Sequence, residues 1–379
     1  MIYFDNAATT FPKPESVLDK MYEYQKKFCA NPGRSAHKIS IISAKVVLDA
    51  RLKIAQLFGL KEPMNVIFTK NCTESLNIAL LGSIKQNEHI ITTVMEHNSI
   101  VRVLEHLKKT RNIDVTYLKP DINGQISPES IENAVTEKTS MIALAHSNNL
   151  TGAVNDLNKI GEIAKKYKLL FLVDAAQSAG KIPIDVNAMN INYLCFPGHK
   201  SLFGPQGTGA LCINTDKLPS PLTFGGTGSF SDMTGYIDMT PDRYETGTLN
   251  SPGICGLAAG IDFVSSIGIE NIRKKEEALT KSLKDKLSSI DNINLYAENL
   301  ASNCGIVSFN IKGCSSSQTA MKLNDYDVCI RGGLHCNPLG HRFLGTLEKG
   351  VCRASLSYFN TEAEVTEFAK IIQKISKEL

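Results

Sequence analysis

Residues 168–209 read KLLFLVDAAQSAGKIPIDVNAMNINYLCFPGHKSLFGPQGTG, and this stretch decides our prediction of the fold. It holds two short apolar runs, Leu169–Val173 and Tyr193–Phe196, which have the length of buried strands and stop at polar residues. Asp174 closes the first run, and Lys200 ends the tripeptide GHK that comes shortly after the second. Because open α/β sheets bind ligands at the carboxyl ends of their strands, we expect Asp174 and Lys200 to face one pocket.

An acid and a lysine in this arrangement suit one cofactor, pyridoxal 5′-phosphate (PLP). PLP enzymes attach the cofactor to a lysine and place an acid against its pyridine nitrogen. A surface lysine and an acid at the end of a strand also occur together in proteins that bind no cofactor. The pair alone therefore leaves both interpretations open, and the other motifs of the chain have to decide.

Length and composition restrict the class of protein. At 379 residues the chain exceeds one typical domain, so we expect two. Its hydrophobic content of 42% and charged content of 21% are ordinary for a soluble globular protein. A net charge of +3, without a signal peptide or a run of about 18 apolar residues, gives no support for nucleic-acid or membrane binding. The ten cysteines are scattered, without C-x-x-C or zinc spacing, which predicts a reducing, cytoplasmic location and no metal site.

Strand-like and helix-like segments alternate up to residue 213, which predicts a mostly parallel sheet covered on both faces. The expected strands are 65–69, 89–94, 113–118, 140–146, 169–173 and 193–196, and the expected helices are 75–82, 100–110, 157–167 and 254–266. The C-terminal part predicts a smaller α+β unit with helices over 270–289, 316–323 and 362–377 and strands over 305–311, 328–331 and 352–357. Neither a Rossmann fingerprint nor a P-loop motif is present.

Several motifs resemble those of class V, fold-type I PLP-dependent enzymes, the family of cysteine desulfurases and selenocysteine lyases. DAAQ at 174–177 and FPGHK at 196–200 are similar to the family's cofactor motifs, and YFDNAATT at 3–10 is similar to its YLDNAATT opening. RGGLHC at 331–336 resembles the reactive loop of the SufS-like, group II members. The resemblance extends to about residue 361, and the motifs keep their order.

This resemblance implies a division of the chain into two domains. We expect the α/β architecture of a fold-type I PLP-dependent transferase. Its large PLP-binding domain would cover residues 1–262, and a smaller α+β domain would cover residues 263–379. The extreme N-terminal segment is expected to pack on the small domain.

The start of one predicted helix is a candidate seat for the PLP phosphate. Thr73 and Glu74 follow a strand and resemble a first helical turn, whose free N–H groups and positive dipole end attract anions. An ordinary helix cap would look the same. The resemblance implies that Cys72 and Thr73 hold the phosphate, and that Thr248, in RYETGT, reaches the phosphate site of a second subunit in a homodimer. Pro197 departs from the family, in which a phosphate-binding serine is common at this position.

The resemblance assigns further residues to the ring of the cofactor. In MEHNS, His97 matches a histidine that stacks on the ring and transfers protons, which an imidazole does well near neutral pH. Asp174 would keep the ring nitrogen protonated. Gln177 and Asn148 would contact the ring oxygen, and Asn148 could also contact the substrate. His199, next to the cofactor lysine, joins the cofactor site.

The resemblance also implies a reaction on L-cysteine. Lys200 would carry PLP and move the Cα proton, while the planar guanidinium of Arg353 would clamp the substrate carboxylate. Arg331 is the alternative clamp, and Ala7 would line the substrate pocket. Cys336 would attack the substrate sulfur, which leaves alanine and a persulfide on the enzyme. A sulfur-acceptor protein or a small thiol would then remove that sulfur.

Other activities remain open beside the desulfuration of L-cysteine. A selenocysteine lyase would use all of these residues on L-selenocysteine. An aminotransferase or a cysteine sulfinate desulfinase would leave Cys336 without a role, and a PLP-binding scaffold would show no turnover. In the desulfurase, we expect His335 and Arg331 to favour the thiolate of Cys336, because positive charge stabilises an anion.

Overall fold

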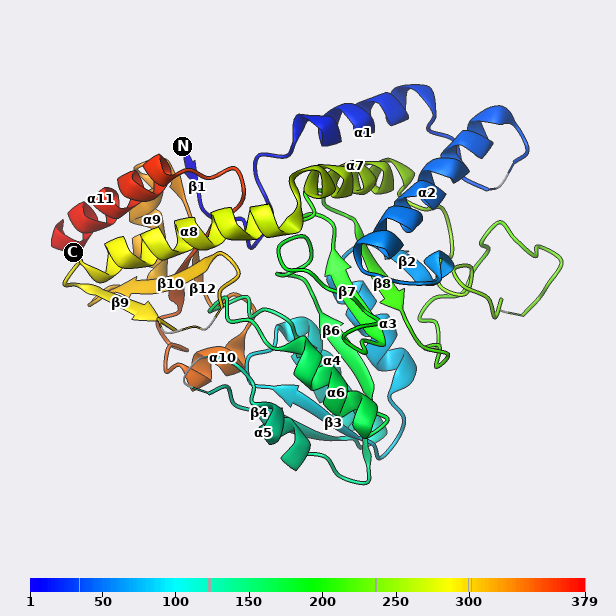
Figure 1. Cartoon of the computed structure of the whole chain (residues 1–379), viewed down its shortest axis with the longest axis horizontal. Helices are drawn as coiled ribbons and strands as arrows, with labels where there is room; N and C mark the ends of the chain where they lie inside the picture. Colours follow the sequence, from blue (N-terminus) through cyan, green and yellow to red (C-terminus); the bar gives the residue numbers. More distant parts are fainter. Residues whose placement is uncertain (34, 122–123, 236, 299, 301, 379) are drawn as a thin grey trace.

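The computed structural model describes residues 1–378 apart from 34, 122–123, 236, 299 and 301. Within these residues the strands form a seven-stranded sheet, a four-stranded sheet and a two-stranded sheet. The seven-stranded sheet forms the centre of the larger part of the molecule, and the four-stranded sheet lies to one side of it with the C-terminal helices (Figure 1).

The seven-stranded sheet has the order β2-β8-β7-β6-β5-β3-β4. Its strands are β2 (Val66–Thr69), β3 (His89–Thr93), β4 (Asp114–Leu118), β5 (Thr139–Ala145), β6 (Leu170–Asp174), β7 (Tyr193–Pro197) and β8 (Gly209–Ile213). Every neighbouring pair is parallel except those of β8, which runs antiparallel to β2 and β7. This confirms the mostly parallel sheet that we predicted. It also brings the carboxyl ends of all strands but β8 to one edge, where open α/β sheets bind ligands.

Helices cover both faces of this sheet. One face packs against α2 (Lys38–Leu57), α5 (Pro128–Asn133), α6 (Leu157–Lys166) and α7 (Ser251–Ile267), with α1 (Glu15–Lys27) outside α7; the other packs against α3 (Cys72–Ser83) and α4 (Asn98–Arg111). In β5, Ile142 and Leu144 face the first layer, while Met141 and Ala143 face the second. Strands buried on both faces are apolar throughout, which is why the sequence located them.

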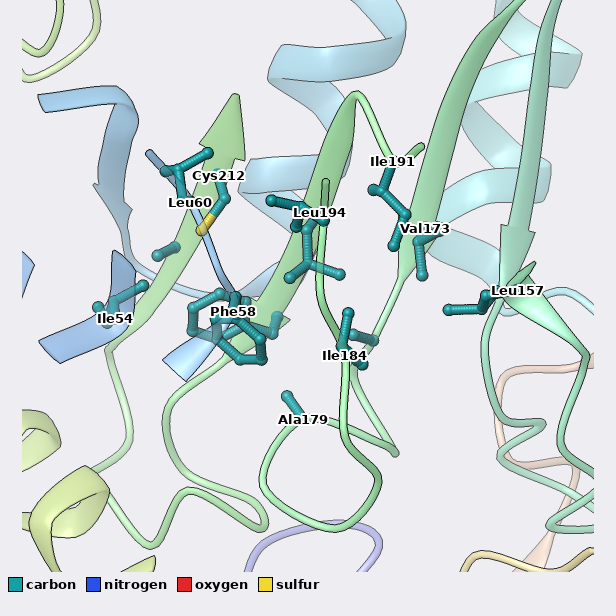
Figure 2. Packing of buried hydrophobic residues seen from close by; sticks show 14 of the residues in the cluster. Ile54, Phe58, Leu60, Leu157, Val173, Ala179, Ile184, Ile191, Leu194 and Cys212 are labelled. Carbon is teal, nitrogen blue, oxygen red and sulfur yellow. The ribbon is translucent and has the colours of Figure 1, made fainter. Parts of the chain in front are cut away.

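Figure 2 shows part of the first of these two cores from close by. Phe58, which follows α2, points into it together with Ile184 and Leu194. The ring centroid of Phe58 lies 4.8 Å from that of Phe196 in β7. This aromatic packing helps to hold β7 in its position in the sheet. The position of β7 matters for the site because the turn that carries Lys200 follows it directly.

The four-stranded sheet belongs to the C-terminal part and is antiparallel throughout. Its order is β12-β13-β10-β9, with β9 (Ile293–Tyr296), β10 (Ile306–Ile311), β12 (Arg331–Gly333) and β13 (Val351–Ser355). Helices α8 (Ile269–Ser288), α9 (Ser316–Asn324) and α11 (Glu362–Glu378) bury apolar faces against it, and the short α10 (Pro338–Phe343) lies between β12 and β13 in the chain. The single strand predicted over 328–331 is wrong, because β11 (Val328–Cys329) and β12 belong to different sheets.

The first residues of the chain pack on this C-terminal part. β1 (Ile2–Tyr3) pairs in parallel with β11, and Asn6 donates from Nδ2 to the carbonyl of Ser355 at 3.0 Å. A few residues on, Thr10 donates from Oγ1 to the carbonyl of Lys200 at 2.9 Å. One short segment therefore connects the C-terminal sheet with the turn that carries Lys200.

The chain bends between α7 and α8 at Gly268, whose φ of 85° lies in the left-handed region that glycine tolerates best. The two helices meet at 79°. The domain boundary predicted between residues 262 and 263 falls inside α7, shortly before this bend. Among the described residues no single helix is long and apolar enough to cross a membrane. The bent pair of α7 and α8 reaches the required length and hydrophobicity, by length and composition only.

Candidate active site

The polar residues that follow the parallel strands gather around one cavity of about 110 Å³. The lining residues are Asn71, Cys72, Thr73, His97, Ser99, Ala145, Ser147, Asn149, Asp174, Ala176, Gln177, Pro197, His199 and Lys200. The structure thus brings together seven residues that we predicted for the cofactor site: Cys72, Thr73, His97, Asp174, Gln177, His199 and Lys200.

Asp174 is the last residue of β6 and is held in one orientation. Its Oδ1 accepts a hydrogen bond from the Ala176 amide at 2.8 Å and one from the thiol of Cys72 at 3.4 Å. The described residues make no hydrogen bond to Oδ2. One oxygen is therefore fixed by the protein, and the other is free for a group in the cavity.

Lys200 comes from the turn that follows β7. Its carbonyl accepts from Thr10 Oγ1 at 2.9 Å and from the Phe203 amide at 2.8 Å, which fixes the backbone of this turn. Burial lowers the pKa of the Lys200 ammonium group from 10.5 to about 8, and the carboxylate of Asp174 opposes this effect. A lowered pKa raises the fraction of neutral amine, which is the form that attacks a carbonyl carbon.

The first turn of α3 supplies the opposite wall. Asn71 is its N-cap, and Asn71 Oδ1 accepts from the Glu74 amide at 2.9 Å. The amides of Cys72 and Thr73 stand at the first two helical positions and have no acceptor within the helix. A Cβ on Gly209 would lie 2.8 Å from the Phe196 carbonyl oxygen, so the close approach of β8 to this turn requires glycine.

His97 lies between the end of β3 and the start of α4, where it is the N-cap. Its Nδ1 accepts from the Ser99 amide at 3.1 Å and lies 2.7 Å from Ser99 Oγ. Burial lowers the pKa of His97, and the carboxylate of Asp174 works in the opposite direction. The imidazole is therefore neutral at neutral pH, with Nδ1 occupied as an acceptor and the rest of the ring facing the cavity.

Gln177 and His199 complete the side of the cavity toward the N-terminal segment. Gln177 donates from Nε2 to the Ala7 carbonyl at 3.2 Å, which places Ala7 behind the cavity wall. Ala7 in turn donates from its amide to Ser355 Oγ at 2.8 Å. Burial lowers the pKa of His199 from 6.5 to about 4, and its buried Nδ1 has no hydrogen-bond partner among the described residues.

Asn148 does not line the cavity, so the prediction that it contacts the cofactor or the substrate needs correction. Its Oδ1 accepts from the amides of Leu150 and Thr151 at 2.9 and 2.8 Å, and its Nδ2 donates to the Met95 carbonyl. The side-chain amide of Asn148 therefore bonds the backbone of neighbouring loops. Asn149 lines the cavity instead. The motif resembles S-N-x-x-G, and the spacing to Gly152 selects Asn149, a signal that the sequence already contained.

Arg353 lies on β13 directly opposite Arg331 of β12, so both guanidinium groups project from the same face of the sheet. Arg353 is 1% exposed. Its Nη2 donates to Asp5 Oδ1 at 3.1 Å and its Nη1 to the Asn149 carbonyl at 2.9 Å, while Nε is buried without a partner among the described residues. Burial lowers the pKa of Arg353 from 12.5 to about 10, so it remains charged at neutral pH.

Cys336 does not line the cavity of Lys200 but an adjoining groove of about 340 Å³. Thr73, His97 and Ser99 are shared by the cavity and the groove, so the two are separated by a thin wall. The φ of Cys336 is 55°, a left-handed conformation that is strained for a residue with a side chain. Arg331 Nη2 lies 4.0 Å from Cys336 Sγ, as expected for a residue that stabilises a thiolate.

His335 does not take the role that we expected beside Cys336. It is 2% exposed, its ring stacks at 6.0 Å on that of His341, and its Nε2 lies 3.0 Å from the Val351 carbonyl, to which it donates. Burial lowers the pKa of His335 from 6.5 to about 3. A neutral, inward-facing imidazole adds no positive charge at the thiol, so this prediction is wrong.

Thr248 lies outside the cavity, in an exposed groove with Thr69, Lys70 and Thr246. Its Oγ1 accepts from Asn31 Nδ2 at 3.2 Å. This position is compatible with the prediction that Thr248 serves a second subunit rather than its own, which stays a prediction.

The match to a family now decides the affiliation of the chain. The family profile described as aminotransferase class-V matches residues 2–368. The chain belongs to the class-V aminotransferase family. This confirms the family that the motifs resembled, whereas the SufS-like, group II subdivision stays a prediction.

Relatives within the class-V family carry one recurring name. The chain is 36% identical to a probable cysteine desulfurase of Methanothermobacter thermautotrophicus, over 99% of this chain and 94% of that protein. It is 32% identical to a probable cysteine desulfurase of Pyrococcus abyssi, over 100% and 95%. The apo structure of a cysteine desulfurase from Thermococcus onnurineus superposes with a TM-score of 0.94 at 32% identity, covering 100% of this chain and 95% of that one.

The cavity of this class-V family chain fits PLP, the cofactor of the family. The cofactor has an aldehyde, a pyridine nitrogen and a phosphate, each of which needs a different partner. Lys200 offers an amine with a lowered pKa, and Asp174 offers a carboxylate oxygen that the protein leaves free. The first turn of α3 offers the amides of Cys72 and Thr73, which have no acceptor within the helix, the usual arrangement for a phosphate.

Proposed function

We propose that this protein is a PLP-dependent cysteine desulfurase, which converts L-cysteine into L-alanine and leaves the sulfur as a persulfide on Cys336. One observation carries the proposal: the cavity of Lys200 and Asp174 adjoins the groove of Cys336, with Arg331 at 4.0 Å from the thiol. The relatives named cysteine desulfurase, at 32–36% identity over nearly the whole chain, support the same activity.

When bound, PLP supplies a protonated ring that accepts the electron pair released as the Cα proton of the substrate leaves. Lys200 would hold the cofactor through Nζ and afterwards move that proton. Asp174 would keep the ring nitrogen protonated through Oδ2, since Oδ1 is fixed by Ala176 and Cys72. His97 would stack on the ring as a neutral imidazole, and we assign the contacts to the ring oxygen to Gln177 and Asn149.

Cys336 would accept the sulfur of the substrate. Its thiolate attacks that sulfur, a new S–S bond forms and the Cβ–S bond breaks. The electron pair of the broken bond stays with Cβ, which takes up a proton, so carbon is reduced and the transferred sulfur is oxidised from the sulfide to the sulfane level. Arg331 stabilises the attacking thiolate and then the persulfide anion. The step needs no external oxidant or reductant.

Arg353 would bind the carboxylate of L-cysteine. Asp5 and the Asn149 carbonyl occupy Nη2 and Nη1, but Nε is buried and unpartnered among the described residues, so the substrate can use the edge that contains Nε. Burial raises the pKa of Asp5, and the guanidinium group of Arg353 opposes that rise.

Arg353→Ala is expected to weaken the binding of L-cysteine by about ten- to a hundredfold, the effect of losing about 1.5–3 kcal/mol of charge-assisted hydrogen bonding. Arg353→Lys should restore only part of the affinity, because an ammonium group cannot form the bidentate pair. Spectral titration of the bound cofactor with L-cysteine measures the dissociation constant. The cofactor absorbance without substrate should be unchanged, and Arg331→Ala serves as the matched control. If only Arg331→Ala weakens binding, Arg331 is the clamp.

The experiment that tests the proposed function measures alanine formed from L-cysteine and from L-selenocysteine side by side. A desulfurase forms alanine from L-cysteine with one persulfide per subunit, and a selenocysteine lyase strongly prefers the selenium substrate. Transfer of the amino group to a keto acid would indicate an aminotransferase, and alanine from cysteine sulfinate alone would indicate a desulfinase. Cofactor absorbance with no product from any of these substrates would leave a PLP-binding scaffold and contradict the proposal.

The resemblance further implies a cytoplasmic homodimer in which Thr248 reaches the phosphate site of the second subunit. Light scattering of the cofactor-loaded protein tests the dimer, and a monomer would contradict it.

A further inference from the structure

We propose that the groove of Cys336 is the binding site for the thiol that removes the sulfur, and that this acceptor is a small thiol that carries a carboxylate. The inference rests on the proposed function, because the groove needs an acceptor only if Cys336 carries a persulfide. The groove of about 340 Å³ has the size of a small-molecule site.

Cys336 lies between the cavity of Lys200, from which it receives sulfur, and the groove, in which it passes the sulfur on. The residue lines the groove and not the cavity of Lys200, although Thr73, His97 and Ser99 line both. Its carbonyl accepts from the Asn98 amide at 2.8 Å, and Asn337 Nδ2 donates to the Met95 carbonyl at 2.8 Å, so the loop is tied to the segment before α4. The backbone of Cys336 is thus held next to the first turn of α4, which also lines the groove.

One stripe of α4 forms the wall that leads outward from Cys336. Asn98, Arg102 and His106 all line the groove and are spaced at i, i+4 and i+8, so they lie on one face of the helix. Each step of four residues advances about 6 Å along the axis. Arg102 therefore lies about one turn beyond the residue that holds Cys336, a length that two carbons between a thiol and a carboxylate can span.

The charge of the groove selects an anion. Its described lining residues are Thr73, Asn77, Leu81, His97, Asn98, Ser99, Arg102, Val103, His106 and Cys336, and this set contains no carboxylate. Arg102 is exposed and takes part in none of the ion pairs found among the described residues. A guanidinium group without an ion-pair partner among the described residues is available for a planar, bidentate carboxylate.

The unloading step balances without a further reactant. The acceptor thiolate attacks the outer sulfur of the Cys336 persulfide, a new S–S bond forms on the acceptor, and the bond to Cys336 Sγ breaks. Cys336 leaves as a thiolate beside Arg331 and is ready for the next substrate. The acceptor is thereby oxidised to a persulfide, while Cys336 returns to its starting state.

The test compares the parent with Arg102→Gln, which keeps a polar side chain of similar length and removes the charge. With 3-mercaptopropionate, 2-mercaptoethanol and cysteamine as acceptors, kcat/KM of sulfur transfer is measured for each variant. For each thiol, the variant is compared with the parent, so that the intrinsic reactivity of the thiol does not affect the ratio. We expect Arg102→Gln to lose about tenfold with 3-mercaptopropionate only, the effect of one charge-assisted hydrogen bond. Lys108→Gln is the matched control, because Lys108 is exposed on α4 and does not line the groove.

A second readout does not depend on turnover. Alkylation of Cys336 by iodoacetate and by iodoacetamide is followed by mass spectrometry of its peptide, which excludes the other thiols. Arg102→Gln should slow the anionic reagent severalfold relative to the neutral one, and Lys108→Gln should not.

The outcomes separate this inference from the proposed function. With one equivalent of L-cysteine per subunit and no other thiol, parent and Arg102→Gln should form the same amount of alanine, because no thiol is then left over to act as acceptor. No alanine from either protein overturns the proposed function and this inference with it. Normal alanine in that single turnover, with equal acceptor preference and equal alkylation ratios in both proteins, overturns the acceptor site alone. Discharge by none of the three thiols would also overturn it.

Discussion

Lys200→Ala is expected to give a folded protein without a lysine-bound cofactor, and to lower alanine formation by about a thousandfold or more. The parent should show a yellow adduct that borohydride fixes to the Lys200 peptide. In the parent, the rate of adduct formation should rise with pH up to about 8 and then level off. The pKa of Lys200 is lowered to about 8 by burial, and only the neutral amine attacks the aldehyde.

Lys13 provides the matched control for this prediction. Burial lowers its pKa to about 8 as well, so a lowered pKa alone does not identify the cofactor lysine. Lys13 Nζ donates to the His199 carbonyl and to Thr10 Oγ1, both at 2.7 Å, and Lys13 does not line the cavity. Lys13→Ala should therefore retain the adduct. An adduct and normal turnover in Lys200→Ala would show that the assignment is wrong.

Cys336→Ala should still bind L-cysteine and change the cofactor spectrum, but alanine formation from L-cysteine should fall by at least about a hundredfold. The C–S bond is not readily broken without a nucleophile that accepts the sulfur. With L-selenocysteine the same variant should keep substantial alanine formation, because the C–Se bond is weaker and selenium leaves more readily. Alanine from both substrates is measured in the presence of excess thiol.

The control here is Cys29→Ala, which removes an exposed thiol that lines neither the cavity nor the groove. It should behave as the parent with both substrates. Turnover of L-cysteine by Cys336→Ala at the parental rate would refute Cys336 as the sulfur acceptor. The aminotransferase interpretation would then become the leading one.

The large sheet was predictable because its strands are buried on both faces. The apolar run Leu169–Val173 became β6, which is shifted by one residue at each end, and Tyr193–Phe196 became β7 with Pro197 added. The helices over residues 15–27 and 38–57 were not predicted. The apolar periodicity of α2 is obscured by four large apolar side chains that are exposed and do not face the core: Ile39, Ile41, Leu48 and Leu52.

The site was predictable where a residue lies at or close to the end of a strand. Asp174 is the last residue of β6 and Lys200 lies in the tight turn after β7, so the strands largely determine where both side chains lie. Side chains within loops were not predictable in the same way. Asn148 turns inward to bind the Met95 carbonyl, and His335 turns inward to bind the Val351 carbonyl, so their roles depend on partners distant in the sequence.

The segment that joins β1 to Thr10 has a consequence for how the enzyme is made. Residues 2–10 are synthesised long before two of their partners, Val328, beside Ile2, and Ser355, beside Asn6. At about 5–20 residues per second, the ribosome adds Ser355 roughly 20–70 s after Asn6. The seven-stranded sheet is complete in sequence by Ile213, so it can assemble while Ile2 and Asn6 still lack these two partners. Asp5 can reach Arg353 only after that, so the substrate side of the active site is completed later than the sheet that carries Asp174 and Lys200.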